Sequence, residues 1–173
     1  MTKNEDPNAL HWYVGFVRSC QERKVAGYLE KAGYEYYLPM QREVHNWSDR
    51  KKIVQCLVLP RMIFVHTTEF LRRQSLELIP YLCGYMNSKG PYSPVVVRDS
   101  DMESFRRMVE YGGRKVGIVQ SLAPGDKVRV VAGPLKGIEC ELLKVHGDRC
   151  LAVRLGPVGT ATIEFASDTV EKI

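Results

Sequence analysis

Hydrophobic positions recur with two different periods at the start of the chain. Residues 11–18 carry aromatic or β-branched side chains at every second position, which predicts a half-buried strand. Residues 21–32 instead carry apolar side chains at helical spacing, and Gly33 supplies a stop signal. The sequence therefore predicts a strand followed by a helix.

The same periods predict the elements up to residue 111. Residues 34–40 are extended, and the polar stretch 41–52 predicts the tip of a hairpin. A central strand follows over residues 55–67, which Pro60 interrupts, and then a helix over residues 69–78, which Thr68 caps and Pro80 ends. Residues 82–86 are again extended. The capping-box pair Ser100 and Glu103 opens the last helix. This order suits an antiparallel sheet with helices packed on one face, an α+β fold.

The last third of the chain predicts strands only. Two valine-rich runs flank AGPLKG at residues 132–137, where Gly133 and Gly137 provide the backbone freedom of a tight loop. Five short strands separated by Gly, Asp and Pro turns predict a small SH3-like all-β barrel. We therefore expect a flexible tail over residues 1–10, a first domain over 11–111, a linker over 112–122 and a barrel over 123–173.

Composition indicates a folded protein with reduced cysteines. The 173 residues are 45% hydrophobic, and neither a long apolar run nor a signal-peptide pattern is present, so we expect a cytoplasmic protein. The five cysteines are odd in number, widely spaced and never in a Cys-x-x-Cys pair. We expect neither a disulfide framework nor a metal site.

Catalytic motifs are missing from the sequence. It has no P-loop, nucleophile elbow or His-Glu metal helix, and GPVGTA is too incomplete for a dinucleotide fingerprint. We therefore expect neither an enzyme nor a cofactor. A net charge of +5, with clustered arginines and lysines, instead favours a polyanionic partner.

Several segments resemble known transcription factors. The strand–AGPLKG–strand segment resembles the KOW motif of elongation factors and ribosomal proteins. From Trp12 onward the chain resembles the NusG family, through WYV, LPRMIFV, IPYLCGY, the KOW segment and the closing VEKI. Within that family it is similar to the UpxY antiterminators of capsular polysaccharide operons and, more distantly, to RfaH. The resemblance implies a NusG N-terminal domain followed by a KOW barrel.

The resemblance also implies a function and two binding surfaces. It implies a monomeric factor that binds the clamp helices of RNA polymerase and promotes processive transcription of specific operons. The apolar docking depression would include Trp12, Tyr13, Leu59, Pro60, Met62, Leu82 and Tyr85, although each could belong to the core instead. Readers of the non-template DNA strand would be Arg18, Gln21, Lys24, Arg72, Arg73 and Gln74, although such residues are common on solvated helices.

Two further loops are candidate contacts in this resemblance. The hairpin tip combines stacking residues with cations that neutralise phosphate, namely His45, Trp47, Arg50, Lys51 and Lys52; a plain solvated loop is the alternative. The barrel loop offers only Leu155, Pro157 and Val158 where housekeeping NusG presents an aromatic residue to Rho or to a ribosomal protein. This difference argues against Rho binding and leaves ribosome binding open.

Two alternative functions are left by the sequence. One is a housekeeping NusG that supports Rho-dependent termination, and the other is a ribosome-associated KOW protein that binds RNA. The sequence also does not decide whether DNA or nascent RNA is read. Refolding of the barrel into a helical hairpin, as in RfaH, is disfavoured because its many valines prefer strands.

Overall fold

The computed structural model describes residues 8–90, 92–111, 115–120, 123–145, 147–165 and 170–173. Most of the predicted tail and part of the predicted linker lie outside these residues. The chain forms two compact units. The first unit comprises Met1–Leu38 and Leu59–Asp99, and the second comprises Pro39–Val58 and Ser100–Ile173. The units are described separately below.

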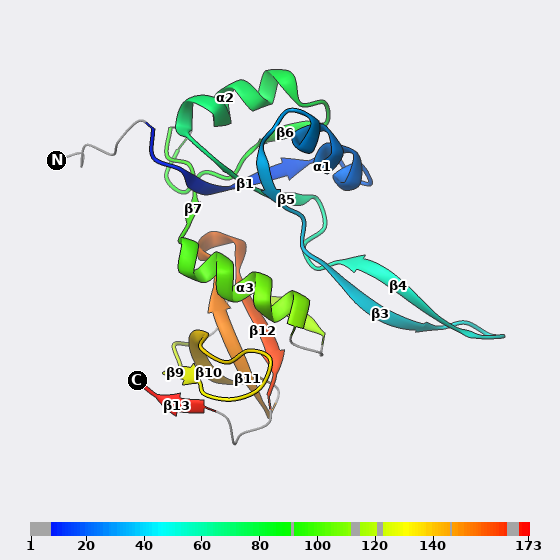
Figure 1. Cartoon of the computed structure of the whole chain (residues 1–173), viewed down its shortest axis with the longest axis vertical. Coiled ribbons are helices and arrows are strands. Elements are labelled where there is room, and N and C mark those ends of the chain that lie inside the picture. Colours follow the sequence, from blue (N-terminus) through cyan, green and yellow to red (C-terminus); the bar gives the residue numbers. More distant parts are fainter. Residues whose placement is uncertain (1–7, 91, 112–114, 121–122, 146, 166–169) are drawn as a thin grey trace. The chain divides into compact units, whose positions relative to one another are not determined.

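The first unit is an antiparallel sheet with two helices (Figure 1). Its strand order is β2-β5-β1-β6, and β7 pairs with β1. The elements are β1 (His11–Val17), α1 (Glu22–Lys31), β2 (Glu35–Tyr37), β5 (Met62–Thr67), α2 (Glu69–Leu78), β6 (Leu82–Tyr85) and β7 (Val96–Val97). The predicted α+β fold is confirmed.

The core of the first unit is centred on β1 and β5. Val14, Ile63 and Phe64 are fully buried, and α1 adds Val25 and Leu29. Successive residues of both strands are buried, whereas the sequence predicts that β1 is buried on one face only. β5 and β1 are the central strands of this sheet, and a strand that is covered on both faces is apolar at nearly every position.

The helix α2 agrees closely with its sequence signals. It spans Glu69–Leu78, and the Thr68 hydroxyl accepts a hydrogen bond from the Leu71 backbone N–H at 3.3 Å. This bond satisfies one of the unpaired N–H groups of the first turn. The third helix, α3 (Asp99–Tyr111), begins one residue before Ser100, so Ser100 lies inside the first turn and not at the predicted cap.

Two strand predictions are wrong. The predicted central strand over residues 55–67 is two strands in different units, because β4 (Lys51–Leu57) ends before Pro60 and β5 starts at Met62. The predicted hairpin tip over residues 41–52 is mostly strand, since β3 (Met40–Asn46) pairs with β4 along its whole length. Most side chains of this hairpin are exposed or half-buried, including the apolar Val44 and Ile53, so it lacks the apolar–polar alternation that identifies a half-buried strand.

The second unit contains this hairpin, most of α3 and a six-stranded antiparallel sheet (Figure 1). The sheet order is β13-β9-β10-β11-β12-β8. Its elements are β8 (Val116–Val119), β9 (Asp126–Val130), β10 (Glu139–Val145), β11 (Asp148–Arg154), the 3-10 turn η1 (Gly156–Val158), β12 (Thr160–Glu164) and β13 (Val170–Lys172). Strand β8 lies within the stretch predicted as linker and pairs with β12.

The loop between β9 and β10 needs its two glycines. Gly133 has φ +82° and Gly137 has φ +88°, in the left-handed region that side chains with a Cβ rarely adopt. The Arg107 guanidinium of α3 donates to the carbonyl of Lys136 in this loop at 2.8 Å. Within the second unit, α3 is thus hydrogen-bonded to the loop between β9 and β10.

A bidentate ion pair joins the strands β10 and β11. Arg154 donates to both carboxylate oxygens of Glu141, at 2.7 and 2.9 Å, and the Gly125 N–H donates to the same carboxylate at 3.1 Å. The hydrogen bond from Arg154 lowers the pKa of Glu141 below its ordinary value of 4.5. The ionised carboxylate is therefore stabilised in the folded sheet.

Acid is expected to remove the contribution of Glu141 to stability. Because the folded-state pKa is lowered, this contribution is complete above about pH 4.5 and is lost as the pH falls through the folded-state pKa. We expect Glu141→Gln to be less stable than the wild type at pH 7, and the difference to shrink in acid. Denaturation midpoints of both proteins across the pH range measure this difference in stability. Glu139→Gln is the control, because Glu139 pairs with Arg129 and both side chains are more exposed. Equal pH dependence in the wild type and in Glu141→Gln would contradict it.

Candidate functional site

Most of the predicted docking residues lie in the core of the first unit. The buried ones are Trp12, Tyr13, Leu59, Leu82 and Tyr85, each at most 6% exposed. The Trp12 ring stacks on His66, with centroids 4.7 Å apart, and the Tyr13 ring meets the edge of Tyr85. Pro60 is exposed and Met62 is half-buried. The accessible part of the predicted depression is therefore the segment that leads into β5.

Arg72 is buried and occupied by other contacts. Its Nε and Nη2 atoms donate to the two carboxylate oxygens of Glu69, both at 2.7 Å. The guanidinium lies 5.4 Å from the centroid of the Tyr13 ring and 5.2 Å from that of Tyr85, within the range of cation–π attraction. The prediction that Arg72 contacts DNA is not supported, because its charged group is held inside the first unit.

The ionisable groups around Arg72 are shifted accordingly. The hydrogen bond from Arg72 lowers the pKa of Glu69, and the bond to Glu69 raises the pKa of Arg72. Burial raises the pKa of Tyr85 to about 12, and its hydroxyl lies 2.8 Å from the Ser75 hydroxyl. Both members of the ion pair remain charged at neutral pH.

The other predicted DNA readers remain accessible. Arg18, Lys24, Arg73 and Gln74 are exposed, and Gln21 is half-buried. The Arg73 Nε atom donates to Glu69 at 2.8 Å, but its side chain is still 64% exposed.

One of these basic residues lies beside Tyr81, which is not among the predicted readers. The Lys24 Nζ atom lies 5.9 Å from the centroid of the Tyr81 ring, and the backbone N–H of Arg18 donates to the Tyr81 backbone carbonyl at 3.0 Å. Tyr81 is 40% exposed. An exposed ring beside a cation can stack on a nucleic-acid base. Its position after Pro80, in a segment between α2 and β6, was the available sequence signal.

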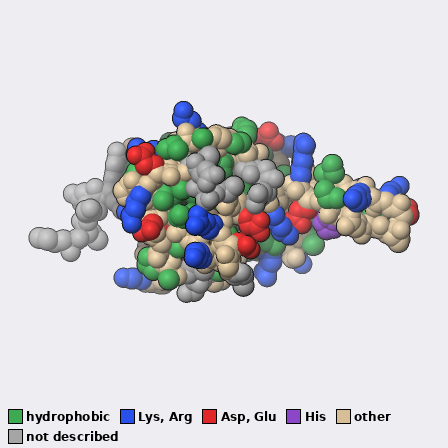
Figure 2. Space-filling view, turned by 90° about the horizontal axis from the view of Figure 1, so that it is seen from below, with side chains coloured by type: hydrophobic (Ala, Val, Ile, Leu, Met, Phe, Trp, Pro, Cys, Tyr) green, Lys and Arg blue, Asp and Glu red, His purple; other side chains and the backbone are tan. Residues whose placement is uncertain are grey.

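The hairpin tip presents its predicted residues to solvent. His45, Trp47, Arg50, Lys51 and Lys52 are all exposed. The Lys52 Nζ atom lies 5.5 Å from the centroid of the Trp47 ring, and the Trp47 N–H donates to the Arg50 carbonyl at 2.9 Å, which closes the turn. Figure 2 shows Lys and Arg side chains and a histidine along the hairpin. The tip can therefore stack on a base and neutralise phosphate.

The barrel loop presents little apolar surface. Leu155 and Val158 are buried, and Pro157 is exposed. Leu155, Pro157 and Val158 are all aliphatic, so they offer no aromatic ring to a partner.

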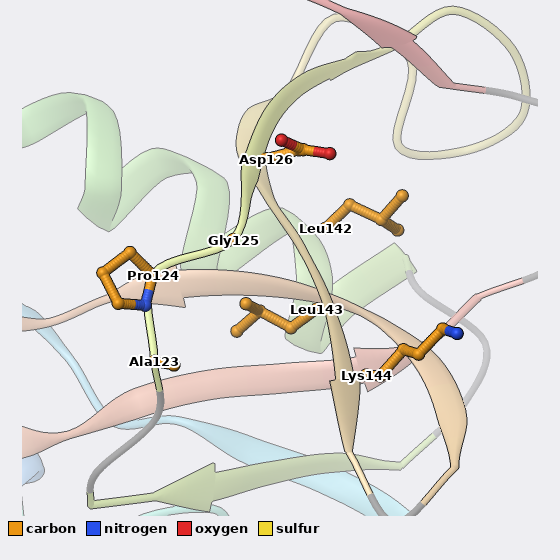
Figure 3. A pocket seen from close by; sticks show the side chains of 7 residues that line it. All are labelled: Ala123, Pro124, Gly125, Asp126, Leu142, Leu143 and Lys144. Atoms are coloured by element: carbon orange, nitrogen blue, oxygen red, sulfur yellow. The ribbon is translucent and has the colours of Figure 1, made fainter.

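A shallow hollow lies beside the start of β9 (Figure 3). It is lined by Ala123, Pro124, Gly125, Asp126, Leu142, Leu143 and Lys144. The Asp126 carboxylate accepts a hydrogen bond from Lys172 at 3.0 Å. The lining is aliphatic and backbone apart from the Asp126 carboxylate and the Lys144 ammonium group. In the part of the chain that the structure describes, no helix is long and apolar enough to cross a membrane.

A solved structure of a NusG protein shares this fold. The structure described as "Domain interaction in Thermotoga maritima NusG" is 21% identical, covers 95% of this chain and 98% of that chain, and has a TM-score of 0.50. The "Crystal Structure of MjSpt4:Spt5 complex conformation A" is 16% identical, covers 94% of this chain and 97% of that chain, and has a TM-score of 0.31. No curated protein matches the chain. The family described as "Transcription termination factor nusG" matches residues 10–106, more than half of the sequence, and the protein therefore belongs to the NusG family of transcription factors.

Proposed function

We propose that this protein is a noncatalytic elongation and antitermination factor that binds RNA polymerase and keeps transcription processive. The observation that carries the proposal is the family match over residues 10–106, which includes every residue of the candidate docking face and of the hairpin tip. Bridging the polymerase clamp to the opposite side of the main cleft would hold the enzyme closed on nucleic acid. Such a mechanical effect requires neither a reactive side chain nor a cofactor.

The docking face in this proposal is the accessible segment that leads into β5. Pro60 and Met62 contact the clamp helices, while the buried residues beneath them hold β1, β5 and β6 in place. A methionine suits this role because its flexible, polarisable side chain adapts to a helical surface.

The nucleic-acid contacts in this proposal come from exposed basic and aromatic groups. Lys24 lies beside the Tyr81 ring, and the exposed Arg18 is bonded to Tyr81 through the backbone. Arg73 and Gln74 lie on α2, and the hairpin tip supplies the rest. The nucleic acid bound is the non-template DNA strand or nascent RNA. Phosphate contacts of this kind weaken as salt concentration rises.

Antitermination is favoured over Rho-dependent termination by the barrel loop. Of its three candidate contacts only Pro157 is exposed, and none is aromatic. This supports a specialised, UpxY-like factor for a restricted operon set, such as capsular or surface polysaccharide operons. Pause and termination assays with and without Rho distinguish it from a housekeeping NusG.

Met62→Glu is expected to reduce capture of core RNA polymerase by the full-length protein at least about tenfold, because a carboxylate buried in an apolar interface costs several kcal/mol. The measurement is copurification from the native host. Leu59 is a poor test site because it is only 6% exposed, so a carboxylate there would disturb the core. Tyr92→Glu, at a side chain of the first unit that is 87% exposed, is the matched control.

Two outcomes would contradict the proposal. Equal capture by Met62→Glu and Tyr92→Glu would show that the docking face lies elsewhere. A wild-type protein that captures ribosomal RNA and no polymerase would establish the ribosome-associated alternative.

A further inference from the structure

Three metal-ligating side chains of different kinds share one face of the β3–β4 hairpin. Gln41 pairs with Cys56 in the strand register, so the side chains at positions 41, 43 and 45 of β3 lie on the same face as Cys56 of β4. The Nε2 atom of His45 lies 3.6 Å from the Sγ atom of Cys56 and 3.7 Å from Oε2 of Glu43. All three ligand atoms lie within 4.8 Å of one another.

Both separations that involve His45 are close to the edges of a tetrahedral zinc site. Zn–S, Zn–N and Zn–O bonds of about 2.3, 2.05 and 2.1 Å at tetrahedral angles place sulfur and nitrogen about 3.6 Å apart and nitrogen and oxygen about 3.4 Å apart. A thiolate, an imidazole and a carboxylate together suit Zn²⁺ better than hard cations such as Mg²⁺, which prefer oxygen ligands only. We propose that Glu43, His45 and Cys56 bind Zn²⁺ across the hairpin, with a water molecule in the fourth position.

Gln41 holds the carboxylate ligand in place. Its Nε2 atom donates to Glu43 Oε1 at 3.0 Å, which leaves Oε2 directed toward His45. Gln41 is itself buried, and its side-chain oxygen accepts a hydrogen bond from the Val116 N–H at 2.9 Å. Outer residues of this kind orient the ligands of metal sites and raise their affinity.

Lys115 is the competitor for this site. Its Nζ atom donates a hydrogen bond to Glu43 Oε2, the oxygen that faces His45, at 3.2 Å. The Lys115 side chain is 70% exposed, so its ammonium group can move into solvent when the metal binds. Lys115 therefore occupies the carboxylate oxygen that would bind Zn²⁺, and Zn²⁺ can replace it.

Metal binding would fix a part of the fold that is weakly held. A two-stranded ribbon without a covering layer is marginally stable in water. Zn²⁺ would join two ligands on β3 to one on β4 and so brace the strands that lead to Trp47. This inference concerns the chain alone and does not depend on the proposed polymerase partner.

The test uses the full-length protein, reduced, titrated with Co²⁺ and then with Zn²⁺. We expect one equivalent of Co²⁺ to produce a thiolate-to-cobalt charge-transfer band that Zn²⁺ abolishes. Cys56→Ser should remove the band and weaken Zn²⁺ binding by at least about 100-fold, beyond the roughly 10–100-fold typical of outer residues. The matched control is Cys83→Ser, which replaces an exposed cysteine on β6 and should leave both unchanged.

A second variant tests the role of the counterion. Lys115→Gln should tighten Zn²⁺ binding severalfold, because it removes the ammonium group that competes for Glu43. Circular dichroism checks the fold of each variant. A wild-type protein without the band, or a band that survives in Cys56→Ser, would overturn the proposal.

Discussion

Arg72→Ala is expected to lower the free energy of unfolding of the first unit by about 3 kcal/mol. Removing one partner of a buried ion pair costs about 3–5 kcal/mol, and the 35% exposure of Glu69 places this pair at the lower end. The loss of cation–π attraction to Tyr13 and Tyr85 adds to this cost.

The measurement is chemical denaturation followed by the fluorescence of Trp12, which is buried in β1, in a Trp47→Phe background. Arg73→Ala is the matched control, because Arg73 binds the same carboxylate from an exposed position and such a pair contributes about 0–1 kcal/mol. Equal destabilisation by the two variants would contradict the role assigned to the buried guanidinium.

The same pair of variants separates stability from nucleic-acid binding. Since Arg72 is inside the first unit, weaker binding by Arg72→Ala would report partial unfolding. Arg73 is exposed, so a change in binding by the well-folded Arg73→Ala variant would report a contact.

Gly125→Ala is expected to destabilise the barrel sheet by about 3 kcal/mol, at the upper end of the usual cost of overpacking. A Cβ atom at Gly125 would overlap Cδ2 of Leu143 and the backbone carbonyl of Leu142 (Figure 3). The side chain of Leu143 can turn, but the carbonyl belongs to the paired strand β10 and cannot move without distorting the sheet. The shift would also disturb the Gly125 N–H bond to Glu141.

Hydrogen exchange of the β9–β12 amides in the full-length protein measures this effect. Gly117→Ala is the matched control in the same sheet, because its Cβ atom would meet only Thr162 Oγ1 at 3.6 Å, an ordinary contact. Faster exchange is expected in Gly125→Ala and not in Gly117→Ala. Wild-type exchange in Gly125→Ala would show that β10 accommodates the extra methyl group.

The sequence by itself determined the elements whose signals are local. The bounds of α2 follow from the Thr68 cap and the helical spacing after it, and the sharp loop before β10 follows from Gly133 and Gly137. The family resemblance was likewise carried by short segments, and the family match over residues 10–106 agrees with it. Such signals act within a few residues, so they can be recognised without knowing the rest of the fold.

Only the tertiary structure decided which residues are buried and which ones meet. Arg72 of α2 is buried against Tyr13 of β1 and Tyr85 of β6. The strands β4 and β5 are separate because they pair with different partners. Glu43, His45 and Cys56 meet only because the register of the hairpin places them on one face. Burial and cross-strand contact depend on pairing between distant residues, and no short window of sequence contains that information.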